Sequence, residues 1–314
     1  MFNRMQRPSG WLLVSLVPLL TAAGGAAAQG LSSGPHFIGP LATGAPPLPK
    51  GAGNIEPYLV NTHVRSVFDD SGDRRALSSA PNLSAIIPVT YGLTDKLTIG
   101  ATLRGQYDRG DNAVAAGDTT LSAQYALYDS AAENRLRVHA SIRQGLDTGR
   151  YDQLGRHDGT GSGARPTSLA VGAQAYFLEG HLRARAAAGW RLPGSHAALR
   201  DRSVYGTGEG FVGRARLGGS LTVTSSVEYS VAPQWTLVGE AMFERSEGTQ
   251  VNGVDGQGRG VDLRGLNNWR ASLLPAVQYH FSDKVGMIAG VQWAFAGRNT
   301  AAIVAPQVAV NVAF

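Results

Sequence analysis

The sequence QVAVNVAF, from Gln307 to Phe314, alternates between apolar residues and small or polar ones. In an extended strand the valines at 308, 310 and 312 share one face with Phe314, because successive side chains point to opposite faces. A strand with one apolar face that ends on an aromatic residue is typical of bacterial outer-membrane β-barrels, whose outer face contacts lipid. We therefore interpret Val310, Val312 and Phe314 as a membrane-insertion signal for the barrel-assembly machinery, and we expect the chain in the bacterial outer membrane.

The other end of the sequence has the pattern of a secretory signal peptide. Arg4 and Arg7 precede the apolar run 11–23, and small residues that end at Ala28 offer a cleavage site. The apolar run is shorter than the ~20 residues that a helix needs to span a bilayer. We predict a signal peptide at 1–28, a Pro/Gly-rich periplasmic or lumenal lead-in at 29–53, and an outer-membrane barrel at 54–314.

The composition narrows the class of partner. The chain has 28 Lys and Arg against 23 Asp and Glu. Removing Arg4 and Arg7 with the signal peptide leaves 26 against 23, a mildly basic balance that gives no argument for binding nucleic acid. Cysteine is absent, so thiolate and disulfide chemistry is excluded. The 41 glycines and the low share of charged residues, 16%, suit many short strands and turns.

From residue 55 onward the alternation has a period of two residues. Leu136 and Val138, for example, alternate with Arg137 and His139. A helix would instead bring together side chains three or four positions apart. The pattern predicts an all-β fold, an antiparallel up-and-down transmembrane β-barrel of about twelve strands. The predicted strands are 55–67, 81–93, 96–108, 118–129, 134–145, 167–178, 181–192, 218–231, 235–246, 268–281, 284–296 and 301–314.

The connections between these strands alternate in length. Short turns such as 94–95 alternate along the chain with long polar connections such as 146–166 and 193–217. Periplasmic turns and extracellular loops alternate in this way in a membrane barrel. An even strand count returns both ends of the barrel to one side. Ten or fourteen strands stay open as alternatives, because 193–217 could contain a hairpin and Pro306 lies near the start of the last run.

Aromatic residues gather at two levels of the predicted strands. Their abundance follows from the preference of aromatic side chains for strands, but the two levels predict the interfacial girdles of a membrane barrel. The set near the short turns and chain ends is Tyr58, Tyr91, Phe177, Tyr229, Trp235, Phe281 and Phe314, and the set near the long loops is Tyr107, Trp190, Phe243, Trp269, Trp293 and Phe295.

The faces opposite the apolar ones would line the lumen. They are rich in Arg in the first half of the chain, and they carry carboxylates in the eighth and ninth strands. Two interpretations stay open: a transverse field across a narrow pore, with Arg on one wall and Glu on the other, or a charge network that fills a closed lumen. The predicted pore-lining residues are Arg65, Arg104, Arg137, His139, Arg143, Arg183, Arg185, Glu228, Glu240 and Glu244.

Three motif-like patterns do not predict catalysis or metal binding. His139 and Ser141 have the spacing of lipid-acting outer-membrane hydrolases, but the alternation turns both toward the lumen, and no carboxylate is placed to orient the histidine. The stretch 208–213 matches G-x-G-x-x-G without the preceding strand and following helix that dinucleotide binding requires. Asp147, Asp152, His157 and Asp158 match no calcium loop. We expect no enzyme activity, no catalytic residue, no cofactor and no metal.

Two regions resemble a known family. FIGPL at 37–41, APPLPKG at 45–51 and NIEPYL at 54–59 are similar to the N-terminal region of outer-membrane proteins named after meta-pathway phenol degradation. PVTYGLTD at 88–95 is similar to the first periplasmic turn of that family. Its members are labelled transporters. The resemblance implies a channel for small compounds, including aromatic or otherwise apolar ones, and implies no catalytic residues.

The sequence thus favours an outer-membrane porin or transporter for passive passage of small solutes, with weak anion preference. The expected partners are outer-membrane lipids, the barrel-assembly machinery and a small-molecule solute. Two alternatives stay open. One is an outer-membrane hydrolase acting on lipid. The other is a structural or surface-interaction barrel with a closed lumen, whose loops 146–166 and 193–217 bind a partner.

Overall fold

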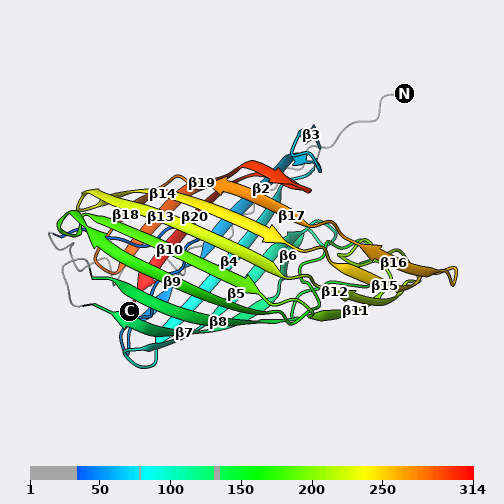
Figure 1. The fold of residues 1–314 in the computed structure, drawn as a ribbon, viewed down its shortest axis with the longest axis horizontal. Coiled ribbons are helices and arrows are strands. Elements are labelled where there is room, and N and C mark those ends of the chain that lie inside the picture. Colours follow the sequence, from blue (N-terminus) through cyan, green and yellow to red (C-terminus); the bar gives the residue numbers. More distant parts are fainter. Residues whose placement is uncertain (1–33, 78, 131–134) are drawn as a thin grey trace.

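The computed structural model describes residues 34–77, 79–130 and 135–314, so the predicted signal peptide, 1–28, lies outside the described residues. Most of the described residues form a closed barrel, and a smaller sheet projects from one end of it (Figure 1). Across the described residues, twelve antiparallel strands close the barrel, which confirms the predicted fold and strand number. Among those residues, no helix has the length and apolar character needed to cross a membrane.

Neighbours in the sequence are neighbours in the wall, and β20 closes the barrel by pairing with β19 on one side and with β1 and β2 on the other. Short strands β3 (Arg74–Ala76) and β6 (Ala113–Ala116) extend two of the long connections. The wall strands are β1 (Gly53–Ile55) with β2 (Tyr58–Phe68), β4 (Asn82–Gly92), β5 (Leu97–Asp108), β7 (Thr119–Asp129), β8 (Arg137–Leu146), β9 (Thr167–Phe177), β10 (Leu182–Arg191), β13 (Ser220–Ala232), β14 (Trp235–Ser246), β17 (Asn268–Leu273) with β18 (Ala276–His280), β19 (Val285–Arg298) and β20 (Thr300–Ala313).

Two of the wall strands are interrupted at a proline. Pro57 separates β1 from β2, and Pro275 separates β17 from β18. Proline has no backbone N–H to donate to a neighbouring strand. Its carbonyl still accepts, however: Val310 N donates to Pro57 O at 3.2 Å and Val291 N to Pro275 O at 3.1 Å. The wall therefore stays continuous across both interruptions.

The outer wall exposes large apolar side chains along its whole height. Leu103 is 49% exposed, for example, and Val227 is 48% exposed. A soluble monomer seldom exposes an apolar patch of more than a few hundred Å², so this surface needs an apolar surrounding. Aromatic residues of both predicted sets lie on it, among them Tyr91, Phe177, Trp235, Phe281, Trp190, Trp293 and Phe295.

Tyr58 is an exception to the predicted girdle. Its ring packs against the inward cluster of Val238, Ile288 and Ala309, and its hydroxyl donates to Glu56 Oε1 at 2.8 Å. The interruption at Pro57 changes the phase of the alternation, so the face of Tyr58 could not be read from the strand pattern alone.

The connections 193–217 and 247–267 form a separate four-stranded sheet, which we name the distal sheet. Its strands are β11 (His196–Arg200), β12 (Val212–Arg216), β15 (Gln250–Val254) and β16 (Gly260–Arg264), in that order. Leu199, Phe211 and Val251 form its buried core. The hairpin suspected in 193–217 exists, but it lies beyond the wall and leaves the strand count at twelve. We call the end of the barrel that carries the distal sheet the long-loop end. The carboxyl terminus lies at the opposite, short-turn end (Figure 1).

Candidate functional site

The described part of the predicted lead-in, residues 34–52, lies inside the barrel and is bonded to inward-facing side chains. On one side Thr236 Oγ1 donates to His36 O at 2.8 Å. Gln278 holds the next turn of the segment with both ends of its amide: Ile38 N donates to Oε1 at 3.0 Å, and Nε2 donates to Gly39 O at 2.9 Å. These bonds tie the start of the lead-in to β14 and β18.

The end of the lead-in is bonded to the opposite part of the wall. Leu48 N donates to Thr98 Oγ1 of β5 at 2.7 Å, and the Arg137 guanidinium of β8 donates to Pro47 O at 3.1 Å. The segment therefore crosses the lumen from β14 and β18 to β5 and β8. Its prolines suit this path, because each removes a backbone N–H that would otherwise need a partner inside the lumen.

Glu240 holds the middle of the lead-in. Its carboxylate is buried and accepts the backbone N–H of Ala42 at 3.0 Å, the backbone N–H of Thr43, and the Thr43 hydroxyl. Hydrogen bonds to a charged acceptor are stronger than neutral ones, about 1.5–3 kcal/mol each. Glu240 is thus the strongest single attachment of the lead-in to the wall.

Two glycines of β19 make room for the apolar side chains of the lead-in. A Cβ at Gly286 would lie 2.5 Å from Ile38 Cδ1, and a Cβ at Gly290 would lie 2.8 Å from Leu41 Cδ1 and 2.6 Å from Pro275 O. All three distances are shorter than ordinary Cβ contacts, so a side chain at either position would force its neighbours to shift, and glycine lets the segment approach the wall without that shift.

A charge network lies beside the lead-in. Arg183 of β10 makes two bonds of 2.7 Å to Glu228 of β13, its direct cross-strand partner. Gln278 Nε2 donates to the same carboxylate at 2.8 Å, and Arg185 lies 3.9 Å from it. The ring of Phe37 stacks under Arg183 at 4.6 Å. All four side chains of the wall are buried, so the network closes this part of the lumen.

Between the lead-in and the wall of β4 to β10 lies a cavity of about 490 Å³. The lead-in contributes an apolar side with Ile38, Leu41 and Leu48. The wall contributes Arg104, Arg143 and Arg185, with hydroxyl groups between them, and Glu56 adds one carboxyl group. The cavity is therefore amphipathic: the lead-in supplies apolar side chains, and the wall carries three guanidinium groups against one carboxyl group.

No family model matches the sequence, and no curated protein matches it significantly. Among solved structures, an outer membrane channel from Pseudomonas putida F1 is 17% identical, covers 88% of this chain and 100% of its own, and superimposes with a TM-score of 0.66. The fold is that of an outer-membrane channel. The toluene transporter TbuX of Ralstonia pickettii (13% identical, 89% and 94% covered, TM-score 0.45) and the NanC porin (8% identical, 82% and 98% covered, TM-score 0.48) are also similar.

The predicted lumen residues have different surroundings inside this channel fold. Arg104, Arg143 and Arg185 line the cavity. Buried contacts take up Arg183, Glu228 and Glu240, while Arg137 bonds to the lead-in and to Asp129 at 2.9 Å. His139 is buried on the same strand, and Glu244 pairs with Arg270. Neither open interpretation describes the whole lumen, because Arg183 and Glu228 are neighbours rather than opposed and a cavity remains beside them.

Arg65 does not follow the prediction. The pairing of β2 with β20 shifts register between Val64 and Ser66, and Arg65 lies in this irregularity with an exposed side chain. Tyr58 at the start of the same strand faces inward, and side chains seven positions apart in a strand point to opposite faces. The phase that β2 has after Pro57 therefore turns Arg65 away from the lumen, and the register shift lies beside it.

The contacts of the lead-in with the wall were not predicted from the sequence. Thr236 and Gln174 were not predicted as site residues either; Thr236 donates to the lead-in, and Gln174 accepts a hydrogen bond from Arg185 at 2.7 Å. The available signal was the Pro-rich composition of 34–52, which suits a chain that must leave few N–H groups unpaired.

His139 and Ser141 are both buried on β8. Within the described part of the chain, the buried Nδ1 of His139 has no hydrogen-bond partner, whereas a catalytic histidine is oriented by a third group. The glycine-rich stretch 208–213 belongs to the distal sheet, where Phe211 is part of the core and Gly213 pairs in β12.

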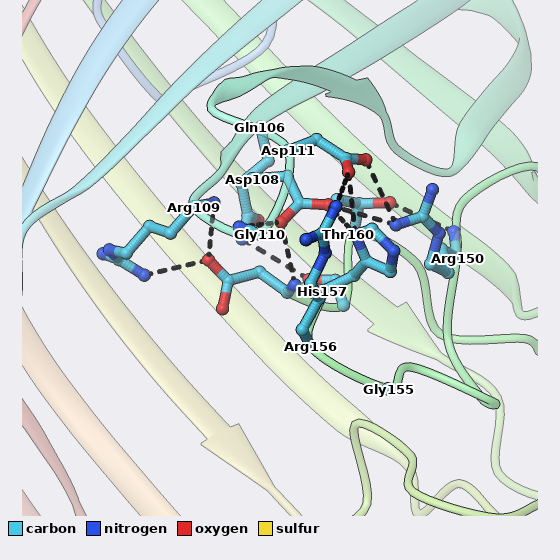
Figure 2. Close-up of polar contacts among 12 residues, drawn as sticks. Gln106, Asp108, Arg109, Gly110, Asp111, Arg150, Gly155, Arg156, His157 and Thr160 are labelled. Atoms are coloured by element: carbon cyan, nitrogen blue, oxygen red, sulfur yellow. Dashed lines mark hydrogen bonds and ion pairs between the residues drawn. The ribbon is translucent and has the colours of Figure 1, made fainter.

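Loop 146–166 is fastened to the end of β5 by a cluster of charges (Figure 2). Asp108 is fully buried and accepts from Gly110 N at 2.8 Å, Asp158 N at 3.0 Å and Arg150 at 3.1 Å. His157 Nδ1 lies 3.3 Å from Asp108 and 3.2 Å from Asp111. Arg150 contacts the same Asp108 oxygen as His157, so its guanidinium compensates the charge of the buried Asp108 carboxylate. The cluster thereby anchors loop 146–166 to the end of β5.

The four loop residues noted in the sequence do not share a site. Asp147 bonds to Arg165 at 2.8 Å, Asp152 accepts Arg200 N at 3.0 Å, and Asp158 pairs with Arg109 at 3.0 Å. The hydrogen bond from Arg165 lowers the pKa of Asp147 below its ordinary value.

Proposed function

We propose that this protein is a passive channel of the bacterial outer membrane, with the long-loop end outside the cell and the short turns in the periplasm. The observation that carries the proposal is the amphipathic cavity inside a closed barrel whose outer wall is apolar. We place the chain in the family named after meta-pathway phenol degradation, on the resemblance of residues 37–59 and 88–95.

The cavity favours a class of solute. Its apolar side, made by the lead-in, suits an aromatic or aliphatic body, and the guanidinium groups of Arg104 and Arg143 suit a carboxylate or another anion. We therefore propose small organic anions with an apolar body as the preferred solutes. The same apolar side favours neutral aromatic compounds over small hydrophilic ones.

The lead-in sets the size of the path. It crosses the lumen and is bonded on both sides, so solutes larger than the cavity would require it to move. Passive passage needs no catalytic residue, and the buried, unoriented His139 supports a protein without hydrolase activity.

The test reconstitutes the mature protein in liposomes and in planar bilayers. We expect discrete conductance, and faster uptake of benzoate than of benzyl alcohol, with benzylammonium slowest, because these solutes match in size and differ in charge. A protein that gives neither conductance nor solute flux would refute the channel. Lipase or deacylase activity that disappears in Ser141→Ala would instead favour the hydrolase.

A further inference from the structure

The outward face of the barrel carries two arginines at the long-loop end, on strands that a third strand separates. Arg245 of β14 pairs across strands with Trp269 of β17, and Trp269 pairs in turn with Arg298 of β19. Directly paired residues point to the same face of a sheet. Strands are ~4.8 Å apart, so the two Cα atoms are separated by about 10 Å. Both arginines are exposed, and among the described residues no carboxylate lies within ion-pair distance of either.

These arginines lie at the level of the aromatic girdle. On the other side of Arg245 its partner is Leu221, which pairs with the exposed Trp190. Phe243 stacks on Trp269 with ring centroids 6.0 Å apart. A charge on the lipid face of a barrel costs roughly 2–4 kcal/mol at the bilayer midplane and about 0–1 kcal/mol near the interface. The placement therefore puts both guanidinium groups at the depth of the lipid headgroups.

A groove of about 510 Å³ joins the two arginines. Its lining combines Arg245 and Arg298 with the rings of Phe243 and Trp269, and it contains no acidic residue. Leu266, which is 65% exposed, lies on its border. The groove thus offers two cations, polar amides from Asn267 and Asn299, and an apolar floor.

We propose that this groove binds the phosphate-bearing headgroup of a glycolipid in the outer leaflet. Arginine binds phosphate through two parallel N–H bonds, and basic clusters at a membrane surface attract anionic headgroups. The rings of Trp269 and Phe243 contact the sugar and the first part of the acyl chains. The inference rests on the proposed membrane location, but it does not depend on what passes through the lumen.

The test measures lipid retention by native mass spectrometry on the detergent-solubilised mature barrel, with bis-phosphorylated lipid A as the probe. Arg245→Gln with Arg298→Gln should weaken binding about 10- to 30-fold, because each arginine near an anionic membrane surface contributes a similar factor to the affinity. Arg200→Gln with Arg214→Gln removes the same charge from exposed positions of the distal sheet and should leave binding unchanged. Dephosphorylated lipid A should bind the wild type no better than the probe binds the double variant.

Equal retention of bis-phosphorylated lipid A by the double variant would overturn the proposal. So would inorganic phosphate that binds as tightly as lipid A, because the groove would then recognise a free anion. Conductance measured in parallel separates the two proposals. A wild-type barrel that conducts while its lipid binding is insensitive to Arg245 and Arg298 refutes only the lipid site.

Discussion

Glu228 lies at the centre of the buried charge network. Its carboxylate is fully buried and faces Arg183 at 2.7 Å and Arg185 at 3.9 Å. Removing one partner of a buried pair leaves uncompensated charge, which costs about 3–5 kcal/mol. We expect Glu228→Gln to lower the free energy of unfolding by that amount, measured by urea titration of the folded, heat-modifiable band.

Glu244→Gln is the matched control for this change. Its pair with Arg270 is partly exposed, so its loss should cost only about 0–1 kcal/mol. Equal effects of the two substitutions would show that the Glu228 network contributes no more than a surface ion pair.

Glu240 holds the lead-in in place through hydrogen bonds. Glu240→Ala removes the acceptor for Ala42 N, Thr43 N and the Thr43 hydroxyl. Three charge-assisted bonds of about 1.5–3 kcal/mol each hold the segment, so their loss should raise the fraction of time in a high-conductance state at least about tenfold. Single-channel recording measures this fraction. Unchanged recordings from a correctly folded variant would show that the lead-in does not limit conductance.

At the residue scale, alternation placed Arg104 and Arg143 on the lumen face, and both line the cavity. It also placed Arg65 there, but Arg65 is exposed, because the interruption at Pro57 changes the phase of the alternation in β2. The up-and-down topology predicted that β10 lies beside β13, but the pairing of Arg183 with Glu228 depends on the register of the two strands, which the alternation does not fix.

At the scale of elements, the fit between the lead-in and β19 depends on two residues without a side chain. Gly286→Val would place atoms where Ile38 lies, and Gly290→Val would place atoms where Leu41 lies and would also meet Pro275 O and Ala276 Cβ of the wall. We expect each substitution to displace the lead-in and to raise conductance as Glu240→Ala does. Gly239→Val is the control, since a Cβ there meets no atom within 4 Å. A Gly239→Val barrel with the same increase would contradict the argument.

The distal sheet has a hydrophobic core separate from the barrel. Phe211 is only 3% exposed and packs with Leu199 and Val251. Replacing a buried phenylalanine with alanine costs about 3–5 kcal/mol, so Phe211→Ala should make the two connections 193–217 and 247–267 sensitive to limited proteolysis. The barrel itself should keep its heat-modifiable migration. Simultaneous loss of both would show that the sheet and the barrel unfold as one unit.

At the scale of the whole molecule, the charges left on the cavity wall set the selectivity. The carboxylates of Glu228 and Glu240 are occupied by Arg183 and the lead-in, whereas Arg104, Arg143 and Arg185 line the cavity together with a single acidic residue, Glu56. We expect weak anion selectivity from the reversal potential in a salt gradient. Arg104→Gln with Arg143→Gln should abolish or invert it, and raising the ionic strength should diminish the difference through screening.

The distal-sheet variant with Arg200→Gln and Arg214→Gln serves again as the control. It removes two positive charges outside the lumen, so the selectivity should stay as in the wild type. A shift of the same size would mean that net charge, and not the cavity wall, determines selectivity.

The alternation of apolar and polar residues along the chain was sufficient to predict the barrel. A wall with one apolar and one polar face must repeat every two residues, and this local pattern located the twelve strands and the closing position of the segment 307–314. What fills the lumen depends instead on contacts between residues far apart in the chain. Ala42 and Glu240 are 198 positions apart, and Ile38 and Gln278 are 240 apart. Such contacts arise when closure of the wall brings distant strands around the lead-in, and no local pattern encodes them.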